Sequence, residues 1–409
     1  MNLIAIILGG GQGRRLFPLT LYRSKPAVPI GGKYRLVDIP ISNSLHAGIK
    51  QIFVLTQYNS ASLNNHILNT YKFDYFSRAS VILLSAEQTV SGAGWFQGTA
   101  DAVRCHLSHY HLKPDDEVLV LSGDQLYRMD YQKIVEFHRS KNADVTISTI
   151  LVSEGEASGF GILKMGADQQ ISDFREKPDS SEERKGFETN ESRRFHASMG
   201  VYLFKASALI GLLKGQEVDF GRELIPRAIR EYKTYGFLFD GYWRDIGTIQ
   251  SFYEANLELT GPYPKFRFHS PKGNIFTHPR FLPPSQILSS HINDSLVSEG
   301  CVVRQATIED SVIGLRSVIN KKASVKRSVI MGADYFEFEV NDTANKIPMG
   351  IGEHSVVENA IIDKNVRIGS HVTIKNVRKL RETDGGAYYI RDGIVIIPKD
   401  AVIPDGMVI

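Results

Sequence analysis

The chain has 409 residues, and its 48 Lys and Arg nearly balance its 45 Asp and Glu, for a formal net charge of +3. This balance excludes the strongly basic surface of a typical nucleic-acid-binding protein. No apolar run approaches the ~18 residues of a membrane-spanning helix, and we expect no signal or transit peptide before the first apolar segment. We therefore expect a cytoplasmic protein without a nucleic-acid or membrane partner. The length allows two or three domains.

Residues 1–260 alternate short apolar segments with amphipathic ones. The pattern predicts strands at 3–8, 51–57, 79–85 and 117–124 and helices at 36–49, 60–71 and 98–110. Near-continuous apolar strands separated by amphipathic helices favour an α/β fold with a doubly wound, mostly parallel, Rossmann-like sheet. In such sheets ligands bind at the carboxyl ends of the strands, so the residues that follow each strand are the first candidates for a site.

The remainder of the chain follows different patterns. Residues 261–285 are rich in proline and glycine, which predicts a linker. From 286 to 409 apolar residues recur six positions apart, in the triplets Leu296, Val302, Ile308; Ile313, Ile319, Val325; and Ile362, Ile368, Ile374. A six-residue period punctuated by glycines predicts a C-terminal left-handed parallel β-helix. A β-sandwich is the alternative, but it requires period-two runs and hairpin turns, which the sequence lacks.

The stretch LGGGQGRRLFPLT, residues 8–20, places a glycine-rich turn directly after the first predicted strand. A dinucleotide-binding G-x-G-x-x-G motif would match at Gly11 and Gly13. Leu16 occupies the place of its third glycine, however, and Pro18 disfavours the expected helix. A P-loop is excluded as well, because the glycines lead to two arginines rather than to Lys-Ser or Lys-Thr.

The same loop is suited to a polyphosphate. Backbone N–H groups of glycines can approach phosphates closely, Arg15 offers a bidentate fork to phosphate oxygens, and Lys25 offers a point charge. The alternative is a solvated loop with two surface charges, which would leave the three consecutive glycines unexplained. We therefore predict a loop that binds a triphosphate.

Segments spread along the whole chain resemble one known family. They are GGGQGRRLFPLT, SKPAVPIGGKYRLVDIPISN, WFQGTADAVR, LSGDQLYRMDY, FREKP, ASMGVYLF, DGYWRDIGTI and IIDKNVRIG. In this order they resemble the sugar-1-phosphate nucleotidyltransferases and, within them, the glucose-1-phosphate adenylyltransferases of plant and cyanobacterial type. The resemblance implies a catalytic domain over 1–260, a linker at 261–285, and a β-helix domain over 286–409 that serves assembly and allosteric regulation. The implied reaction converts ATP and glucose 1-phosphate into ADP-glucose and diphosphate for glycogen or starch synthesis.

The implied reaction needs no general base, because the nucleophile is a sugar phosphate that is already anionic at pH 7. The enzyme must bring two polyanions together and stabilise charge on the leaving diphosphate, which requires cations. The resemblance implies that Arg15, Lys25 and Asp124 are catalytic. It also implies that Asp124 and Asp245 hold one Mg²⁺. From the residues alone, Asp124 is equally consistent with a turn aspartate and Asp245 with a salt bridge to Arg244.

The resemblance further implies the substrate contacts: Gly10, Gly11, Arg15, Lys25, Gln57 and Gly98 for ATP, and Gly161, Glu176, Lys177 and Ser198 for glucose 1-phosphate. From the residues alone, Gln57 is also consistent with strand capping, and Thr99 with an N-cap of the following helix. Two positions depart from the family pattern. Arg14 stands where threonine is usual, and Gln125 stands where histidine is common.

Members of this family are allosteric, so the resemblance implies anionic metabolite effectors and a homotetramer or mixed tetramer. The candidate effector residues are basic: Arg35, Arg378, Lys379, Arg381, Arg391 and Lys399. A solvated basic face is the alternative. Two other functions stay open: a nucleotidyltransferase that uses another nucleotide or sugar phosphate, and a regulatory subunit with little catalysis, in some of which Gln125 also occurs. Cys105 and Cys301 form no metal-ligand or disulfide pattern, and we expect no redox control.

Overall fold

The computed structural model of the chain describes residues 2–74, 76–86, 88, 89, 92–189, 194–271, 273–339 and 346–409. The chain divides into two compact units, each assembled from separate segments. The first unit comprises Met1–Gly11, Ile39–Ser60 and Ile67–Trp243. The second comprises Gln12–Asp38, Ala61–His66 and Arg244–Ile409.

The α-helices of the described residues are α1 (Asp38–His46), α2 (Ala61–Thr70), α3 (Thr99–Cys105), α4 (Tyr131–Ser140), α5 (Glu154–Ala157), α6 (Ser181–Arg184), α7 (Ala206–Leu213), α8 (Ile225–Glu231) and α9 (Ile249–Glu258). The first three confirm the predicted helices in shorter form. α1 ends where Gly48 adopts a φ of 77°, and the N–H of Ile49 then donates to the carbonyl of Ser44 at 3.1 Å, as in a helix C-terminal motif. Within the described ranges, no helix is long and apolar enough to cross a bilayer.

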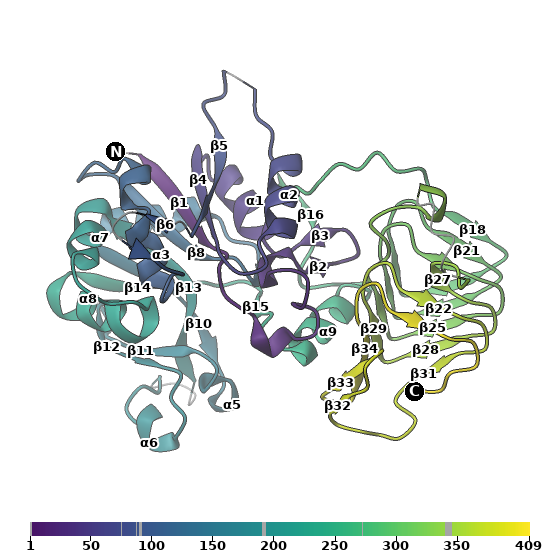
Figure 1. Cartoon of the computed structure of the whole chain (residues 1–409). Helices are drawn as coiled ribbons and strands as arrows, with labels where there is room; N and C mark the ends of the chain where they lie inside the picture. Colours follow the sequence, from purple (N-terminus) through teal and green to yellow (C-terminus); the bar gives the residue numbers. More distant parts are fainter. Residues whose placement is uncertain are drawn as a thin grey trace. The chain divides into compact units, whose positions relative to one another are not determined.

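The first unit is built around a sheet with the strand order β12-β11-β13-β8-β1-β4-β5 (Figure 1). In addition, β10 pairs with β13, and β14 pairs with β10. These strands are β1 (Leu3–Leu8), β4 (Gln51–Thr56), β5 (Ser80–Ser85), β8 (Glu117–Ser122), β10 (Val145–Val152), β11 (Gly161–Met165), β12 (Ile171–Glu176), β13 (Phe195–Lys205) and β14 (Thr234–Leu238). β8, β1, β4 and β5 are parallel, as predicted. β13 runs antiparallel to β8, and β10 and β11 run antiparallel to β13.

Apolar side chains cover both faces of this sheet, which confirms the doubly wound α/β arrangement. On one face α3, α7 and α8 pack against β1, β8 and β13, through Ile4, Ile6, Val103, Val118, Phe204, Leu209, Leu212 and Ile225. On the other face α4 packs against β10 and β13. Each such buried side chain stabilises the fold by about 1.5–3 kcal/mol relative to an exposed one. Short pairs complete the α/β part: β2 (Pro29–Ile30), β3 (Tyr34–Arg35), β6 (Gln88–Thr89), β7 (Gly92–Ala93), β9 (Gln125–Tyr127) and β15 (Trp243–Asp245).

In the second unit, the described residues from 286 onward wind into a parallel β-helix with three sheets (Figure 1). The first contains β18 (Gln286–Leu288), β21 (Val302–Arg304), β24 (Val318–Ile319), β27 (Gly350–Ile351), β30 (Arg367–Ile368) and β35 (Val402–Ile403). The second contains β19 (His291–Asn293), β22 (Thr307–Glu309), β25 (Ser324–Lys326), β28 (Val356–Glu358) and β31 (Thr373–Ile374). The third contains β20 (Leu296–Val297), β23 (Val312–Ile313), β26 (Val329–Ile330), β29 (Ala360–Ile362) and β34 (Ile394–Ile397), and continues into the antiparallel β33 (Tyr389–Arg391) and β32 (Thr383–Asp384). A short hairpin, β16 (His269–Ser270) with β17 (Gly273–Asn274), precedes it.

The burial of side chains in the β-helix confirms two of the predicted triplets and contradicts part of the third. The triplets that begin at Ile313 and Ile362 point into the core as expected, and so does Ile308. Leu296 and Val302 are only half-buried, and their neighbours Val297 and Val303 pack against the core instead. Successive inward-facing residues are five positions apart at some corners of the β-helix and six at others. A strict period of six therefore falls out of step with the side chains that face the core.

α4 carries a buried histidine that makes stability depend on pH. The Nδ1 atom of His138 lies 2.8 Å from the hydroxyl of Thr146, and burial lowers the pKa of His138 from 6.5 to about 4. The fold therefore favours neutral His138. Its contribution to stability is complete above pH 6.5 and is lost as the pH falls through that range to about 4.

We expect the wild type to lose up to about 3 kcal/mol of unfolding free energy relative to His138→Gln as the pH falls from neutral to about 4. Urea unfolding followed by circular dichroism at several pH values measures this difference. His46→Gln, at an exposed position of α1, is the matched control and is expected to follow the wild type. Parallel pH profiles for the wild type and His138→Gln would contradict the expectation.

Candidate active site

The residues that follow β1 and β4 meet at the carboxyl edge of the sheet. A Cβ built on Gly10 would lie 3.3 Å from the Cβ of Gln57, whereas Gly11 is exposed and has open space around it. The side-chain amide of Gln57 accepts a hydrogen bond from the N–H of Phe96 at 2.8 Å and donates one to its carbonyl at 3.4 Å. In this structure Gln57 positions the loop at Phe96, and its contact with adenine stays a prediction.

Gly98 precedes α3, at a point where the backbone of Val218 comes very close. Its φ of −177° is open to any residue, but a Cβ there would lie 2.2 Å from the carbonyl oxygen of Val218. That carbonyl accepts a hydrogen bond from the N–H of Ala100 at 2.9 Å. The predicted N-cap at Thr99 is wrong, because Gly98 is the N-cap. The Thr99 hydroxyl instead donates to Asp219 at 3.1 Å, which ties the start of α3 to the segment after Val218.

Asp124 lies two residues beyond β8, at the predicted edge of the sheet. It is half-buried, and its carboxylate accepts a hydrogen bond from the Ser122 hydroxyl at 2.5 Å. Gln125 is buried, and its Oε1 accepts a hydrogen bond from the indole N–H of Trp243 at 3.2 Å. Gly200, with a φ of 66°, allows β13 to approach this corner, since a Cβ would lie 3.3 Å from Nε2 of Gln125. The unusual glutamine therefore holds Trp243 next to the predicted metal ligand.

Glu176 and Lys177 form a charge pair at the end of β12. Oε1 of Glu176 lies 3.1 Å from Nζ of Lys177, and Lys177 has a φ of 46°, an uncommon conformation for a lysine. The other carboxylate oxygen occupies space that two glycines leave open: a Cβ would lie 2.7 Å from Oε2 of Glu176 if built on Gly161 and 2.6 Å if built on Gly221. The pairing of β11 with β12 thus brings Gly161, Glu176 and Lys177 together.

Ser198 is buried on β13, within the first unit. Its hydroxyl donates to the hydroxyl of Tyr202 at 3.3 Å and accepts from the N–H of Gly200 at 3.2 Å. The Tyr202 ring stacks on Phe220, with ring centroids 5.8 Å apart, and burial raises the pKa of Tyr202, so that its hydroxyl stays protonated. Ser198 is thus fixed by the protein, and its contact with the sugar stays a prediction.

In the second unit, Arg15, Lys25 and Asp245 lie together. Nζ of Lys25 is 3.8 Å from Oδ1 of Asp245. A Cβ built on Gly247 would lie 2.2 Å from Oδ2 of Asp245 and 3.3 Å from Nη2 of Arg15. Arg244, the alternative partner of Asp245, forms ion pairs with glutamates of α9. The structure therefore groups two predicted diphosphate-binding cations with one predicted metal ligand.

The turn that carries Arg15 depends on Gly13. This residue has a φ of 62°, and a Cβ on it would lie 3.1 Å from the Cβ of Lys25. Nε of Arg14, by contrast, donates to the side chain of Gln12 at 2.7 Å on the exposed side of the turn. Arg14 is thus engaged in a local contact that the sequence did not indicate.

Arg35 and Lys399, two of the predicted effector residues, belong to one group of cations in the second unit. Nζ of Lys399 and Nζ of Lys364 bind the carboxylate of Asp334 at 2.8 and 2.5 Å. Burial and repulsion from Arg23 lower the pKa of Arg35 to about 10. Burial and repulsion from Arg35 likewise lower the pKa of Lys364. Buried cations that repel one another favour the binding of an anion.

Sequence reasoning missed Arg23, Arg280 and Lys364 in this group. Nη1 of Arg23 pairs with Asp363 at 2.9 Å, while its buried Nη2 has no hydrogen-bond partner among the described residues. Burial lowers the pKa of Arg280 as well. Arg23 directly precedes the SKPAV motif and Lys364 lies inside IIDKNVRIG, but only the fold places them near Arg35.

The remaining predicted effector residues have different surroundings. Arg378, Lys379 and Arg381 are exposed. Arg391, on β33, forms an ion pair with Asp384 at 2.5 Å. The structure therefore does not gather all six predicted effector residues around one point.

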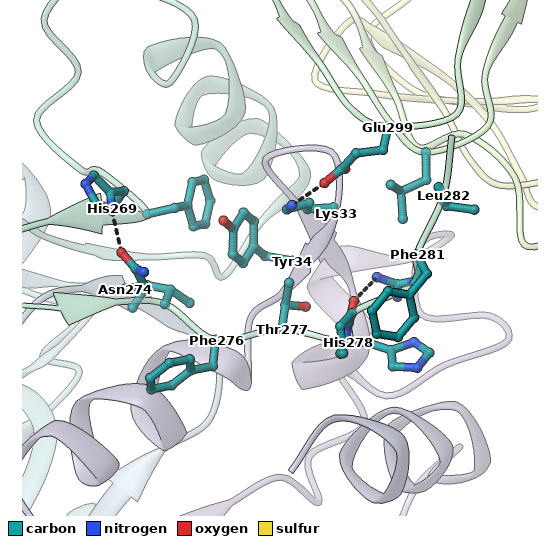
Figure 2. A pocket seen from close by; sticks show the side chains of 15 residues that line it. Lys33, Tyr34, His269, Asn274, Phe276, Thr277, His278, Phe281, Leu282 and Glu299 are labelled. Atoms are coloured by element: carbon teal, nitrogen blue, oxygen red, sulfur yellow. Dashed lines mark hydrogen bonds and ion pairs between the residues drawn. The ribbon is translucent and has the colours of Figure 1, made fainter. Parts of the chain in front are cut away.

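A pocket of about 520 Å³ opens within the second unit (Figure 2). Nζ of Lys33 meets the carboxylate of Glu299 at 2.5 Å, Tyr34 stacks on Phe268 with centroids 3.8 Å apart, and Arg280 also lines the pocket. None of the residues predicted to bind ATP or glucose 1-phosphate lines this pocket. This pocket is a second candidate binding site. Two of its lining residues, Lys33 and Tyr34, directly precede Arg35 in the sequence.

Two family models match the chain. A model described as nucleotidyl transferase matches residues 4–261. A second model, described as a GLGC left-handed parallel β-helix domain, matches residues 280–408. Together they establish an α/β transferase domain followed by a left-handed β-helix.

Proposed function

The chain belongs to the nucleotidyl transferase family, and we propose that within this family it is a glucose-1-phosphate adenylyltransferase. The observation that carries the proposal is the GLGC-type β-helix that follows the transferase domain in the same chain. The motifs quoted above support the same enzyme. The product is ADP-glucose, the activated glucose for glycogen or starch synthesis.

The residues suit a reaction that is driven by charge. A phosphate oxygen of glucose 1-phosphate attacks the α-phosphorus of ATP, and the bond to the β-phosphate oxygen breaks as diphosphate leaves. Arg15 and Lys25, which lie together beside Asp245, are proposed to stabilise the leaving diphosphate. Lys177 is proposed to hold the sugar phosphate, with Glu176 accepting hydrogen bonds from sugar hydroxyls. No side chain has to remove a proton from the nucleophile.

Asp124 and Asp245 are the proposed ligands of Mg²⁺. Asp124 fits this role because its carboxylate is half-buried at a strand end and is oriented by Ser122. Among the described residues no three His, Cys, Asp or Glu side chains gather as a metal cage. Two carboxylates with phosphate oxygens from the substrate form the kind of site that Mg²⁺ prefers. The metal would supply positive charge at the phosphates.

We also propose that anionic metabolites regulate the enzyme through the cations around Asp334, and that the chain assembles as a homotetramer or mixed tetramer. The pairing of Lys364 and Lys399 with one carboxylate, together with the unpartnered Nη2 of Arg23, supports an anion site there.

Release of diphosphate tests the function directly. The purified chain with Mg²⁺ and glucose 1-phosphate is expected to release diphosphate with ATP and far less with UTP, dTTP or GTP. Release with UTP but not ATP would move the proposal to another nucleotide sugar. Absence of release with every nucleotide would instead favour a regulatory subunit, in line with the glutamine at position 125.

Asp124→Asn is expected to lower kcat by at least about 100-fold, because an amide is a much weaker Mg²⁺ ligand than a carboxylate. Circular dichroism should remain that of the wild type, since the side chain is not part of the apolar core. Asp130→Asn, at an exposed position of the first unit, is the control. Activity retained in Asp124→Asn would remove this residue from the mechanism.

Lys399→Gln is expected to raise the concentration of activator for half-maximal effect by about tenfold, as one charge-assisted hydrogen bond is lost. The activators to compare are fructose 6-phosphate, fructose 1,6-bisphosphate, 3-phosphoglycerate and pyruvate, with inorganic phosphate as an inhibitor. Lys375→Gln removes an exposed lysine and serves as the control. If none of these anions changes the rate of the wild type, the proposed regulation is wrong.

A further inference from the structure

The turn that carries Arg15 has an aromatic residue at its end. Arg15 lies in the 3₁₀ turn Arg14–Leu16, and its side chain is exposed. The side chain of Leu16 is fully buried, and the N–H of Phe17 donates to the carbonyl of Arg14 at 3.2 Å. The direction of the turn is therefore set by what Leu16 and Phe17 pack against.

Phe17 packs against the end of the β-helix domain, inside the second unit. Its ring meets that of Tyr389 edge-to-face, with centroids 5.2 Å apart and planes at 82°. The guanidinium carbon of Arg391 lies 5.7 Å from the Phe17 centroid and 5.5 Å from the Tyr389 centroid. Both distances lie within the range of cation–π attraction. Tyr389 and Arg391 thus form a socket for Phe17.

Besides its contacts with the two aromatic rings, the guanidinium of Arg391 is fixed by hydrogen bonds and an ion pair. Nη1 donates to the carbonyls of Thr383 and Ile390, each at 2.9 Å, and Nη2 pairs with Asp384 at 2.5 Å. The side chain is only 21% exposed. A charged group held by two carbonyls and a carboxylate has few other orientations, so the socket is preorganised by the β32–β33 hairpin.

We propose that Arg391 and Tyr389 are positioning residues for Arg15, and that they act through Phe17. The proposal rests on the function proposed above, in which Arg15 stabilises the leaving diphosphate. A charge that acts in the transition state must be held in place before the reaction, because a misplaced cation loses much of its effect. The C-terminal domain would thus contribute to catalysis by positioning Arg15, in addition to its proposed roles in assembly and regulation.

Steady-state kinetics test the proposal. Arg391→Ala and Phe17→Leu are each expected to lower kcat about threefold to tenfold, the range that loss of a partly exposed cation–π contact predicts, and to leave KM for glucose 1-phosphate unchanged. Phe17→Tyr should retain the rate, because it keeps the ring. The double variant should be no slower than the slower single variant, since both changes remove one contact. Arg304→Ala, at an exposed position of β21, is the control.

Limited trypsin digestion provides a readout that does not require activity. Cleavage after Arg14 and Arg15, followed by mass spectrometry of the N-terminal fragment, is expected to be faster in Phe17→Leu and Arg391→Ala than in the wild type and Arg304→Ala. Unchanged kinetics and unchanged cleavage would overturn the proposal. If the wild type releases no diphosphate with any nucleotide, the proposed function fails, and the cleavage rates alone decide whether the socket positions the turn.

Discussion

Pairing of lysines with carboxylates fixes the charged groups on which the proposed activity depends. The pairs are Lys25 with Asp245 at 3.8 Å, Lys177 with Glu176 at 3.1 Å and Lys399 with Asp334 at 2.8 Å. A solvent-exposed pair of this kind stabilises a fold by only ~0.2–1 kcal/mol, and none of these three pairs is fully removed from solvent. Their main effect is therefore on position: each carboxylate offsets the repulsion among neighbouring cations and holds a lysine at its proposed phosphate-binding position.

Other predicted site residues lie where a glycine lets a distant part of the chain come close to the backbone. The carbonyl of Val218 lies where a Cβ of Gly98 would be, and the carboxylate of Glu176 lies where a Cβ of Gly161 or Gly221 would be. A side chain at any of these positions would displace a backbone carbonyl or the carboxylate itself. Gly98 and Gly161 were predicted as substrate contacts, and the structure adds a steric reason for both. Gly221 could not have been selected, because its partner lies 45 residues earlier in sequence.

Two sequence predictions failed, each for a different physical reason. In the β-helix, turns of unequal length shift the inward side chains, so that Val303 lies in the core and Val297 packs against it, where Val302 and Leu296 were expected. Thr99 satisfied the local rule for an N-cap, yet its hydroxyl bonds to Asp219 in a distant segment.

The sequence by itself determined the main strands and helices of the transferase domain up to residue 124, the change to a repeating β-helix, and the family, because these follow from local periodicity and from motifs read in order. Only the tertiary structure decided which charges become neighbours. Arg23, Arg35 and Lys364 are separated by more than 300 residues at the widest, and nothing local indicates that they share one buried region. The same holds for Phe17 and Arg391. Contacts between distant segments depend on how the chain folds back on itself, which no short pattern of residues encodes.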